Sequence, residues 1–177
     1  MITGRSRFNL YLLVALVAIV AVGCRTHKDN KKKQLATFRV HLEAGPQDTG
    51  RSIQVPIYRA NPVQLQVQNE PFLTELNVAS AKVVDVLGGF DLQIQLNREG
   101  SMLLQEYSAN NRGKHFAIFT QFGEKGKNAR WLGAPAFSRM MPDGLIQLTP
   151  DCTREEADEI AIGLNNTAKK NEKDMQW

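Results

Sequence analysis

Three histidines are the residues of this 177-residue chain best suited to acid–base or metal chemistry. His27, His41 and His115 are far apart in the sequence, and no pair has the spacing of a metal site or a catalytic triad. His41 belongs to a segment of alternating polar and apolar residues, where we expect it to face outward. The histidines therefore predict neither a metal site nor a hydrolase.

Carboxylates are concentrated in one turn of a predicted helix, at Glu155, Glu156, Asp158 and Glu159. A catalytic or metal-binding use is one interpretation. Acidic side chains in a first helical turn also stabilise the helix dipole, and we favour this structural interpretation. We expect no catalytic residue, no metal and no cofactor, and we expect that the protein is not an enzyme.

The segment Gly123–Asn128 has a superficial similarity to a phosphate-binding loop. It lacks the required Gly-x4-Gly-Lys-Ser/Thr pattern and lies between two predicted strands. We interpret it as a charged, flexible hairpin tip, and we name Glu124, Lys125 and Lys127 as a candidate binding loop. The preceding strand could line an apolar site with Phe116, Ile118, Phe119 and Phe122, but core packing is the favoured interpretation.

An apolar run at Leu10–Val22 precedes the first cysteine and follows Arg5 and Arg7. Its 13 residues are too few for a bilayer core, which needs about 20 in a helix. A positive start, a short apolar region and a small residue before a cleavage point are the layout of a secretory signal. We therefore predict a signal peptide at residues 1–23.

The segment Ala21–Cys24 resembles the lipobox of bacterial lipoproteins, in which small residues precede a cysteine. The resemblance implies cleavage after Gly23, a diacylglyceryl group on Cys24 and acylation of the new amine. The chain would then be lipid-anchored in the cell envelope and would face the periplasm. Arg25 stands where enteric inner-membrane lipoproteins have aspartate, which favours the outer membrane. An uncleaved signal anchor with an incidental cysteine is the alternative.

The second cysteine has no disulfide partner if Cys24 is acylated. Cys152 precedes a predicted helix start, where a reactive thiolate would be favoured. We favour the alternative, a small residue near the helix cap.

The formal charge of +4 is concentrated at the beginning of the chain. Seven of the 22 basic residues and one of the 18 acidic residues lie in the first 33 positions, which leaves −2 for the remainder. The folded part is therefore slightly acidic, and we expect no nucleic-acid partner. Residues 24–34 read as the lipidated cysteine and a flexible basic tether.

Alternation of polar and apolar residues predicts an N-terminal β segment at residues 35–69. Its strands are expected at Thr37–Glu43, Ile53–Ile57 and Val63–Gln68, and Pro56 indicates that the second lies at a sheet edge. These strands could form a small sheet of their own or extend a later one.

A second block, residues 70–168, mixes strands with two amphipathic helices. One helix begins after the N-cap Asn97 and stops at Gly113, and the other begins with a capping box formed by Thr153 and Glu156. Strands are expected at 79–87, 90–96, 114–122, 130–140 and 145–148, and a polar tail at 169–177. The pattern predicts an α+β fold in which two helices pack on one face of a mostly antiparallel sheet.

Several short motifs follow one another in a fixed order along the second block. They are Leu96-Asn97-x-Glu99-Gly100, Asn111-x-Gly113-Lys114-x-x-Ala117-Ile118, Ala134-Pro135, and Thr153-x-Glu155-Glu156-Ala157 with Leu164. This set resembles the head of the first large periplasmic domain of the SecD and SecDF protein-export subunits. The resemblance covers somewhat over half of the chain. It consists mostly of turn and cap residues, so it indicates a shared fold more than a shared activity.

The resemblance implies a domain that contacts emerging, unfolded chains on the outer side of the membrane. We expect this chain to depart from the family in lacking a transmembrane bundle after the domain and in having a longer Gly123–Asn128 loop. We expect a lipid-anchored, non-catalytic binding module that contacts exported polypeptides or Sec translocon components, with pairing at a free sheet edge. The alternative is a structural or interaction lipoprotein of the envelope with no role in export.

Overall fold

The segment Thr37–Leu42 alternates polar and apolar residues and forms an inner strand of the main sheet. The computed structural model describes residues 34–48 and 50–174. Phe38, Val40 and Leu42 are buried on one face of the strand β1 (Thr37–Leu42). This strand lies between β4 and β7 in a sheet of order β4-β1-β7-β8.

Hydrogen bonding divides the strands into three antiparallel sheets. Besides β1, the strands are β2 (Ser52–Ile57), β3 (Val63–Gln68), β4 (Leu73–Thr74), β5 (Val78–Val86), β6 (Gly89–Leu96), β7 (Phe116–Phe122), β8 (Asn128–Gly133) and β9 (Leu145–Leu148). The helices are α2 (Arg98–Asn110) and α3 (Arg154–Asp174), and short 3-10 turns lie at η1 (Pro46–Asp48), η2 (Glu75–Asn77) and η3 (Glu124–Gly126). The second sheet is the β2–β3 hairpin and the third has the order β5-β6-β9.

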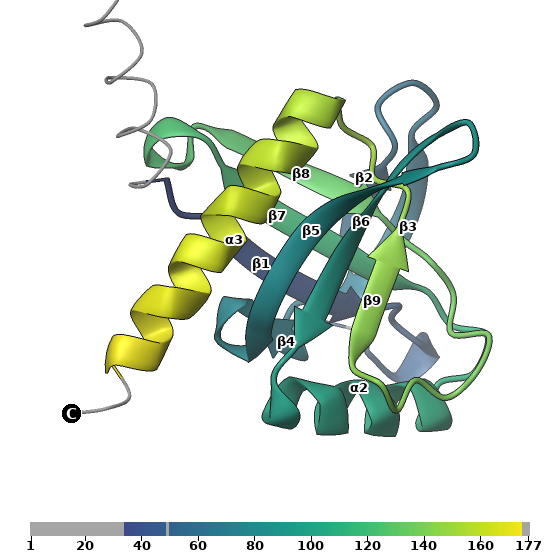
Figure 1. Ribbon diagram of the computed structural model, residues 1–177. Coiled ribbons are helices and arrows are strands. Elements are labelled where there is room, and N and C mark those ends of the chain that lie inside the picture. Colours follow the sequence, from purple (N-terminus) through teal and green to yellow (C-terminus); the bar gives the residue numbers. More distant parts are fainter. Residues whose placement is uncertain (1–33, 49, 175–177) are drawn as a thin grey trace, which may run out of the picture. The chain divides into compact units, whose positions relative to one another are not determined.

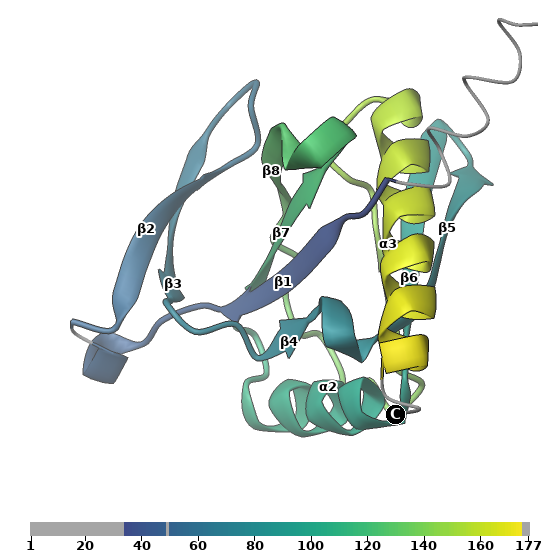
Figure 2. The same ribbon diagram turned by 90° about the vertical axis from the view of Figure 1, so that its left-hand side faces the viewer.

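The four-stranded and three-stranded sheets enclose the main core. Figure 2 shows the β2–β3 hairpin, the four-stranded sheet and the three-stranded sheet as successive layers from left to right. Helix α3 packs along β5 and also contacts β1 and β7, whereas α2 packs against β4, β6 and η2 (Figure 1). The predicted α+β fold, with antiparallel strands and two helices, is confirmed.

The core is built from apolar side chains of both sheets and both helices. Phe116, Ile118 and Phe122 of β7 are buried in it, as the favoured interpretation of that strand predicts. Leu92, Ile94 and Leu96 of β6 face them from the other sheet. Across the part of the chain that the structure describes, no helix combines the length and hydropathy of a membrane span.

Helix α3 closes the outer edge of the three-stranded sheet. Asn165 accepts a hydrogen bond from the Ala81 backbone N–H (2.9 Å) and donates one to the Ala81 carbonyl (2.8 Å). The side chain thus occupies the backbone groups of Ala81, one of the positions at which another strand would pair with β5. The helix continues from Lys169 to Asp174, within the segment expected to be a polar tail.

The first three strands do not form a sheet of their own. Strand β1 joins the four-stranded sheet, whereas β2 and β3 pair only with each other and pack over its outer face. There Val55, Ile57 and Val67 cover Ala117 and Trp131. Neither alternative left open by the sequence holds for all three strands, because β1 extends the four-stranded sheet and the hairpin is a sheet by itself.

His41 does not face solvent, so the expectation of an outward-facing side chain is wrong. Its side chain points away from the main core, as the alternation predicts, but the hairpin covers that face and leaves the residue 7% exposed. The Nδ1–H donates to the Gln68 carbonyl (2.9 Å), and the ring meets Trp131 edge-on at 5.5 Å.

Both predicted helix starts are confirmed. Asn97 caps α2 by accepting a hydrogen bond from the Gly100 backbone N–H (2.9 Å). At α3, the Thr153 hydroxyl accepts from the Glu156 backbone N–H (3.3 Å) and the Glu156 carboxylate accepts from the Thr153 N–H (2.9 Å). This reciprocal pair is the capping box.

Candidate functional site

The predicted binding loop lies at η3, between β7 and β8. Glu124, Lys125 and Lys127 are all exposed, and within the described residues none of them forms an ion pair. Lys125 has a left-handed backbone (φ 57°), which places it at the apex of a tight turn. A binding role for this loop remains a prediction.

The acidic turn of α3 has structural partners. Glu156 completes the capping box and also pairs with the Arg130 guanidinium, whose hydrogen bond lowers the pKa of Glu156. Arg154 pairs with Asp85 on β5. No group of three or more metal-binding side chains occurs among the residues that the structure describes.

Cys152 lies just before α3 with its thiol half-buried. Burial raises the pKa of Cys152 to about 11, so the thiol is protonated at neutral pH. A protonated thiol is a weak nucleophile. This environment favours the interpretation of Cys152 as a small residue near the helix cap. Cys24 and Gly23, the predicted lipidation and cleavage sites, lie outside the described residues.

Strand β9 has one free edge. The Leu96 N–H donates to the Gly144 carbonyl (2.8 Å), so these two residues are a hydrogen-bonded pair. This pair determines which residues of β9 direct their backbone groups toward β6 and which direct them away. Because paired residues in an antiparallel ladder alternate between hydrogen-bonded and non-hydrogen-bonded, Leu145 and Gln147 direct their backbone N–H and C=O groups away from β6. Since β9 is last in its sheet, these groups face the open edge.

A second backbone edge faces β9. The chain after β8 continues beside the start of β7, where Phe137 N–H donates to the Lys114 carbonyl and Phe116 N–H to the Pro135 carbonyl (both 2.9 Å). Ala136 is therefore bridged to His115 as a non-hydrogen-bonded pair. Its own N–H and C=O point to the side away from β7.

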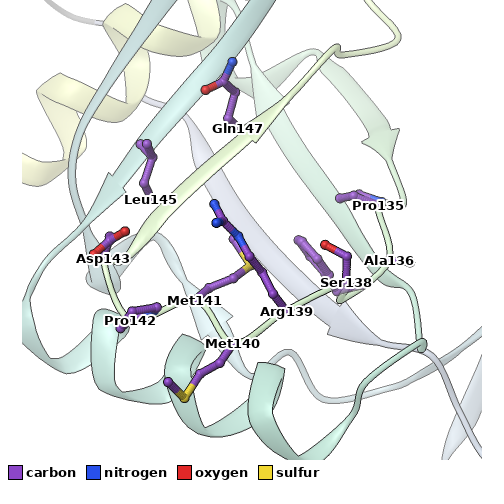
Figure 3. Close-up of a pocket in the computed structure, with 11 residues that line it drawn as sticks. Pro135, Ala136, Ser138, Arg139, Met140, Met141, Pro142, Asp143, Leu145 and Gln147 are labelled. Atoms are coloured by element: carbon purple, nitrogen blue, oxygen red, sulfur yellow. The ribbon is translucent and has the colours of Figure 1, made fainter.

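Between these two edges lies a pocket of about 490 Å³, which we call the slot. Figure 3 shows Leu145 and Gln147 on the β9 side, Pro135, Ala136 and Ser138 on the opposite side, and Arg139 between them. The lining residues are Phe116, Pro135, Ala136, Ser138, Arg139, Met140, Met141, Pro142, Asp143, Leu145 and Gln147. The slot thus offers unpaired backbone groups from both sides, an arrangement that suits an extended polypeptide.

Methionines extend the slot toward α2. Met140 is 45% exposed and also lines a neighbouring pocket of about 410 Å³ with Met102, which is 63% exposed. Methionine is unbranched and polarisable, so it adapts to apolar side chains of different shapes. The two pockets together can accept varied apolar groups next to the free edge of β9.

The outer edge of β2, which ends the hairpin sheet, is less suited to pairing than that of β9. The Asn69 N–H donates to the Arg51 carbonyl (2.8 Å), so Gln54 and Pro56 of β2 direct their backbone toward the open side. Pro56 has no N–H to donate there. Compared with the β2 edge, the β9 edge therefore keeps all of its backbone donors.

Sequence reasoning did not find the slot. The segment Arg130–Met140 was expected to be one extended strand, but β8 ends at Gly133 and the chain then lines the slot. The available signal was the run Met140-Met141-Pro142, two flexible apolar residues beside a turn. Which strand edge remains open depends on the order of the strands, and this order is not written in local sequence.

Comparison with protein families gives one match. The model of the SecDF P1 head subdomain matches residues 52–168, about two thirds of the chain. The matched segment includes the β2–β3 hairpin, the slot and α3 as far as Ala168. No curated protein sequence matches the chain closely enough to count as a relative.

Solved structures of SecDF share the fold. One, described as a membrane component that enhances protein export, aligns with a TM-score of 0.53 and 20% identity over 75% of this chain and 63% of its own. SecDF in its super-membrane-facing form aligns with a TM-score of 0.53 and 19% identity, over 74% of this chain and 19% of its own. The chain therefore spans less than two thirds of the length of either protein.

Proposed function

The chain belongs to the SecDF P1 head subdomain family, and on this premise we propose that it binds extended segments of exported polypeptides in the slot beside β9. One observation carries the proposal: the free edge of β9 and the outward-pointing backbone groups of Ala136 lie on opposite sides of a pocket. The solved SecDF described as enhancing protein export supports the choice of ligand. The proposed role is binding without catalysis.

Backbone pairing suits a ligand whose sequence varies. Every residue of a polypeptide except proline has the same backbone donor and acceptor, so strand addition gives affinity that depends little on side chains. A net contribution of about 0.5–1.5 kcal/mol per hydrogen bond makes a short edge a weak binder. Weak, rapidly reversible binding allows a chain in transit to be held and released.

We further propose that a lipid on Cys24 holds the domain at a membrane of the cell envelope, facing the periplasm, with the outer membrane favoured. Multiple acyl chains form a firm anchor at about 0.8 kcal/mol per buried methylene. Components of the Sec translocon are the second proposed partner, and Glu124, Lys125 and Lys127 are proposed to contact the ligand beside the slot. Incorporation of labelled palmitate into the chain, abolished by Cys24→Ala but not by Cys152→Ala, tests the anchor.

Proline at an outward backbone position tests the slot. Gln147→Pro removes one N–H from the free edge of β9 and leaves the bonds to β6 in place. We expect the purified full chain carrying Gln147→Pro to lose about tenfold in affinity for a labelled unfolded polypeptide, measured by fluorescence polarisation.

Two variants serve as controls. Gln147→Ala removes the side-chain bonds to Gln93 (2.9 Å) and Asp91 (2.7 Å) but keeps the backbone N–H. Gln54→Pro places the same change on β2, where the edge already contains Pro56. Equal loss of affinity in Gln147→Pro and Gln54→Pro would contradict binding at the slot. Stable capture of one folded envelope protein instead would favour the alternative, an assembly role unrelated to export.

A further inference from the structure

We infer that the slot selects extended segments in which apolar and polar residues alternate, the pattern of strands that bury one face. This inference rests on the proposed function and adds a substrate class to it. The geometry that leads to it is the difference between the inner and outer sides of the slot.

The inner side of the slot is apolar. Phe116 is only 2% exposed and belongs to the main core, and Met141 packs against the same core. A ligand side chain directed inward would therefore contact an aromatic ring and a thioether. Burying an apolar group at this position is favourable, whereas a polar group would lose its hydration without a hydrogen-bond partner.

The outer side of the slot is polar. Gln147 is exposed and belongs to a hydrogen-bonded row on the outer face of the three-stranded sheet, where its amide bonds Asp91 (2.7 Å) and Gln93 (2.9 Å). Arg139 and Asp143 of the slot are also exposed and of opposite charge. A ligand side chain directed outward would lie among amides, charges and water.

A strand held by its backbone places successive side chains on opposite sides. With β9 fixing the orientation, every second residue of the ligand faces Phe116 and Met141, and the residues between face Gln147. A continuous apolar segment would expose half of its side chains among polar groups, and a uniformly polar one would bury half of its groups without partners. A segment in which apolar and polar residues alternate places its apolar side chains on the inner side and its polar side chains on the outer side.

The test uses two synthetic peptides of identical composition, one with strict alternation of apolar and polar residues and one with the same residues in blocks. We expect the purified full chain to bind the alternating peptide about tenfold more tightly in a polarisation assay. Gln147→Leu makes the outer side apolar at an exposed position and should reduce this ratio by strengthening the binding of the blocked peptide. Circular dichroism checks that the variant is folded.

The outcomes separate the two proposals. If both peptides bind with equal affinity and both are weakened by Gln147→Pro, the slot binds extended chains and the inference of alternation is overturned. If neither peptide binds, or Gln147→Pro changes nothing, the proposed function itself fails. A preference for the alternating peptide that Gln147→Leu leaves unchanged would place the selectivity elsewhere and would also overturn the inference.

Discussion

His41 is buried where the hairpin covers the main sheet, with its ring against Trp131 and its Nδ1–H bonded to the Gln68 carbonyl. Burial lowers the pKa of His41 below its ordinary value of 6.5, and the positive charge of Arg39 acts in the same direction. The folded state therefore binds a proton less readily than the unfolded state. Above about pH 6.5 the ring is neutral in both states and does not lower the free energy of unfolding. As the pH falls below this value, the unfolded state binds the proton first, and the free energy of unfolding decreases.

We predict that the melting temperature of the chain falls between about pH 7.5 and about pH 5.5, and that His41→Gln reduces this fall. Glutamine can keep a donor for Gln68 but does not titrate. Most carboxylates titrate below this window, so their contribution is small. His115→Gln is the control, since His115 is exposed beside Glu43 (2.9 Å). The same pH dependence in wild type and His41→Gln would refute the role of His41.

Gly144, at the start of β9, has a left-handed backbone (φ 63°) and lies against α2. A Cβ on Gly144 would lie 1.9 Å from the Ser101 Oγ and 2.7 Å from its Cβ. We predict that Gly144→Ala destabilises the fold by about 2–4 kcal/mol in urea unfolding, through clash and backbone strain. Gly88→Ala is the matched control, because Gly88 has φ 88° with open space around it and should lose only about 1 kcal/mol. Equal losses would show that the contact with α2 is unimportant.

At the scale of elements, the two outer strands of the three-stranded sheet differ. Strand β5 is closed by Asn165 of α3, whereas β9 is open and faces the slot. An open edge is a risk for aggregation, so proteins usually cover or blunt it. A single sheet with one edge covered and one edge open is the arrangement expected if the open edge has a ligand.

Removal of the Asn165 side chain should expose the β5 edge. We predict that Asn165→Ala destabilises the chain by about 1–3 kcal/mol, because the Ala81 N–H and carbonyl lose their partners. Self-association in analytical ultracentrifugation should increase as well. Asn171→Ala is the control, since Asn171 makes one long bond to the Glu75 carbonyl (3.4 Å). An Asn165→Ala variant as stable and as monomeric as the control would contradict this account.

The sequence predicted the elements of this fold better than their arrangement. Alternation identified β3 and the turn signal at Pro142–Gly144 identified β9, both with their observed bounds. Asn97 and Thr153 identified the helix starts. These signals are local. The burial of His41 required knowledge that the hairpin returns over β1, and the slot required the strand order. Both are long-range properties that alternation and caps do not encode.

For the whole molecule, the family match identifies the domain, and the slot is its proposed binding site for exported polypeptides. The chain matches the SecDF P1 head subdomain over residues 52–168, but spans 63% and 19% of the two SecDF chains with which it was aligned. A role in export, as opposed to a shared fold alone, therefore has to be established from the molecules that the domain binds in the cell.

Site-specific photo-cross-linking in living cells tests the central claim most directly. A photoreactive residue at Ser138 lines the slot, one at Lys125 lies in the neighbouring loop, and one at Gln54 lies on the outer edge of β2. We predict that Ser138 captures many different exported polypeptides before they fold, that Lys125 captures fewer, and that Gln54 captures almost none. Equal capture from Ser138 and Gln54, or one folded envelope protein from every position, would contradict binding of exported chains in the slot.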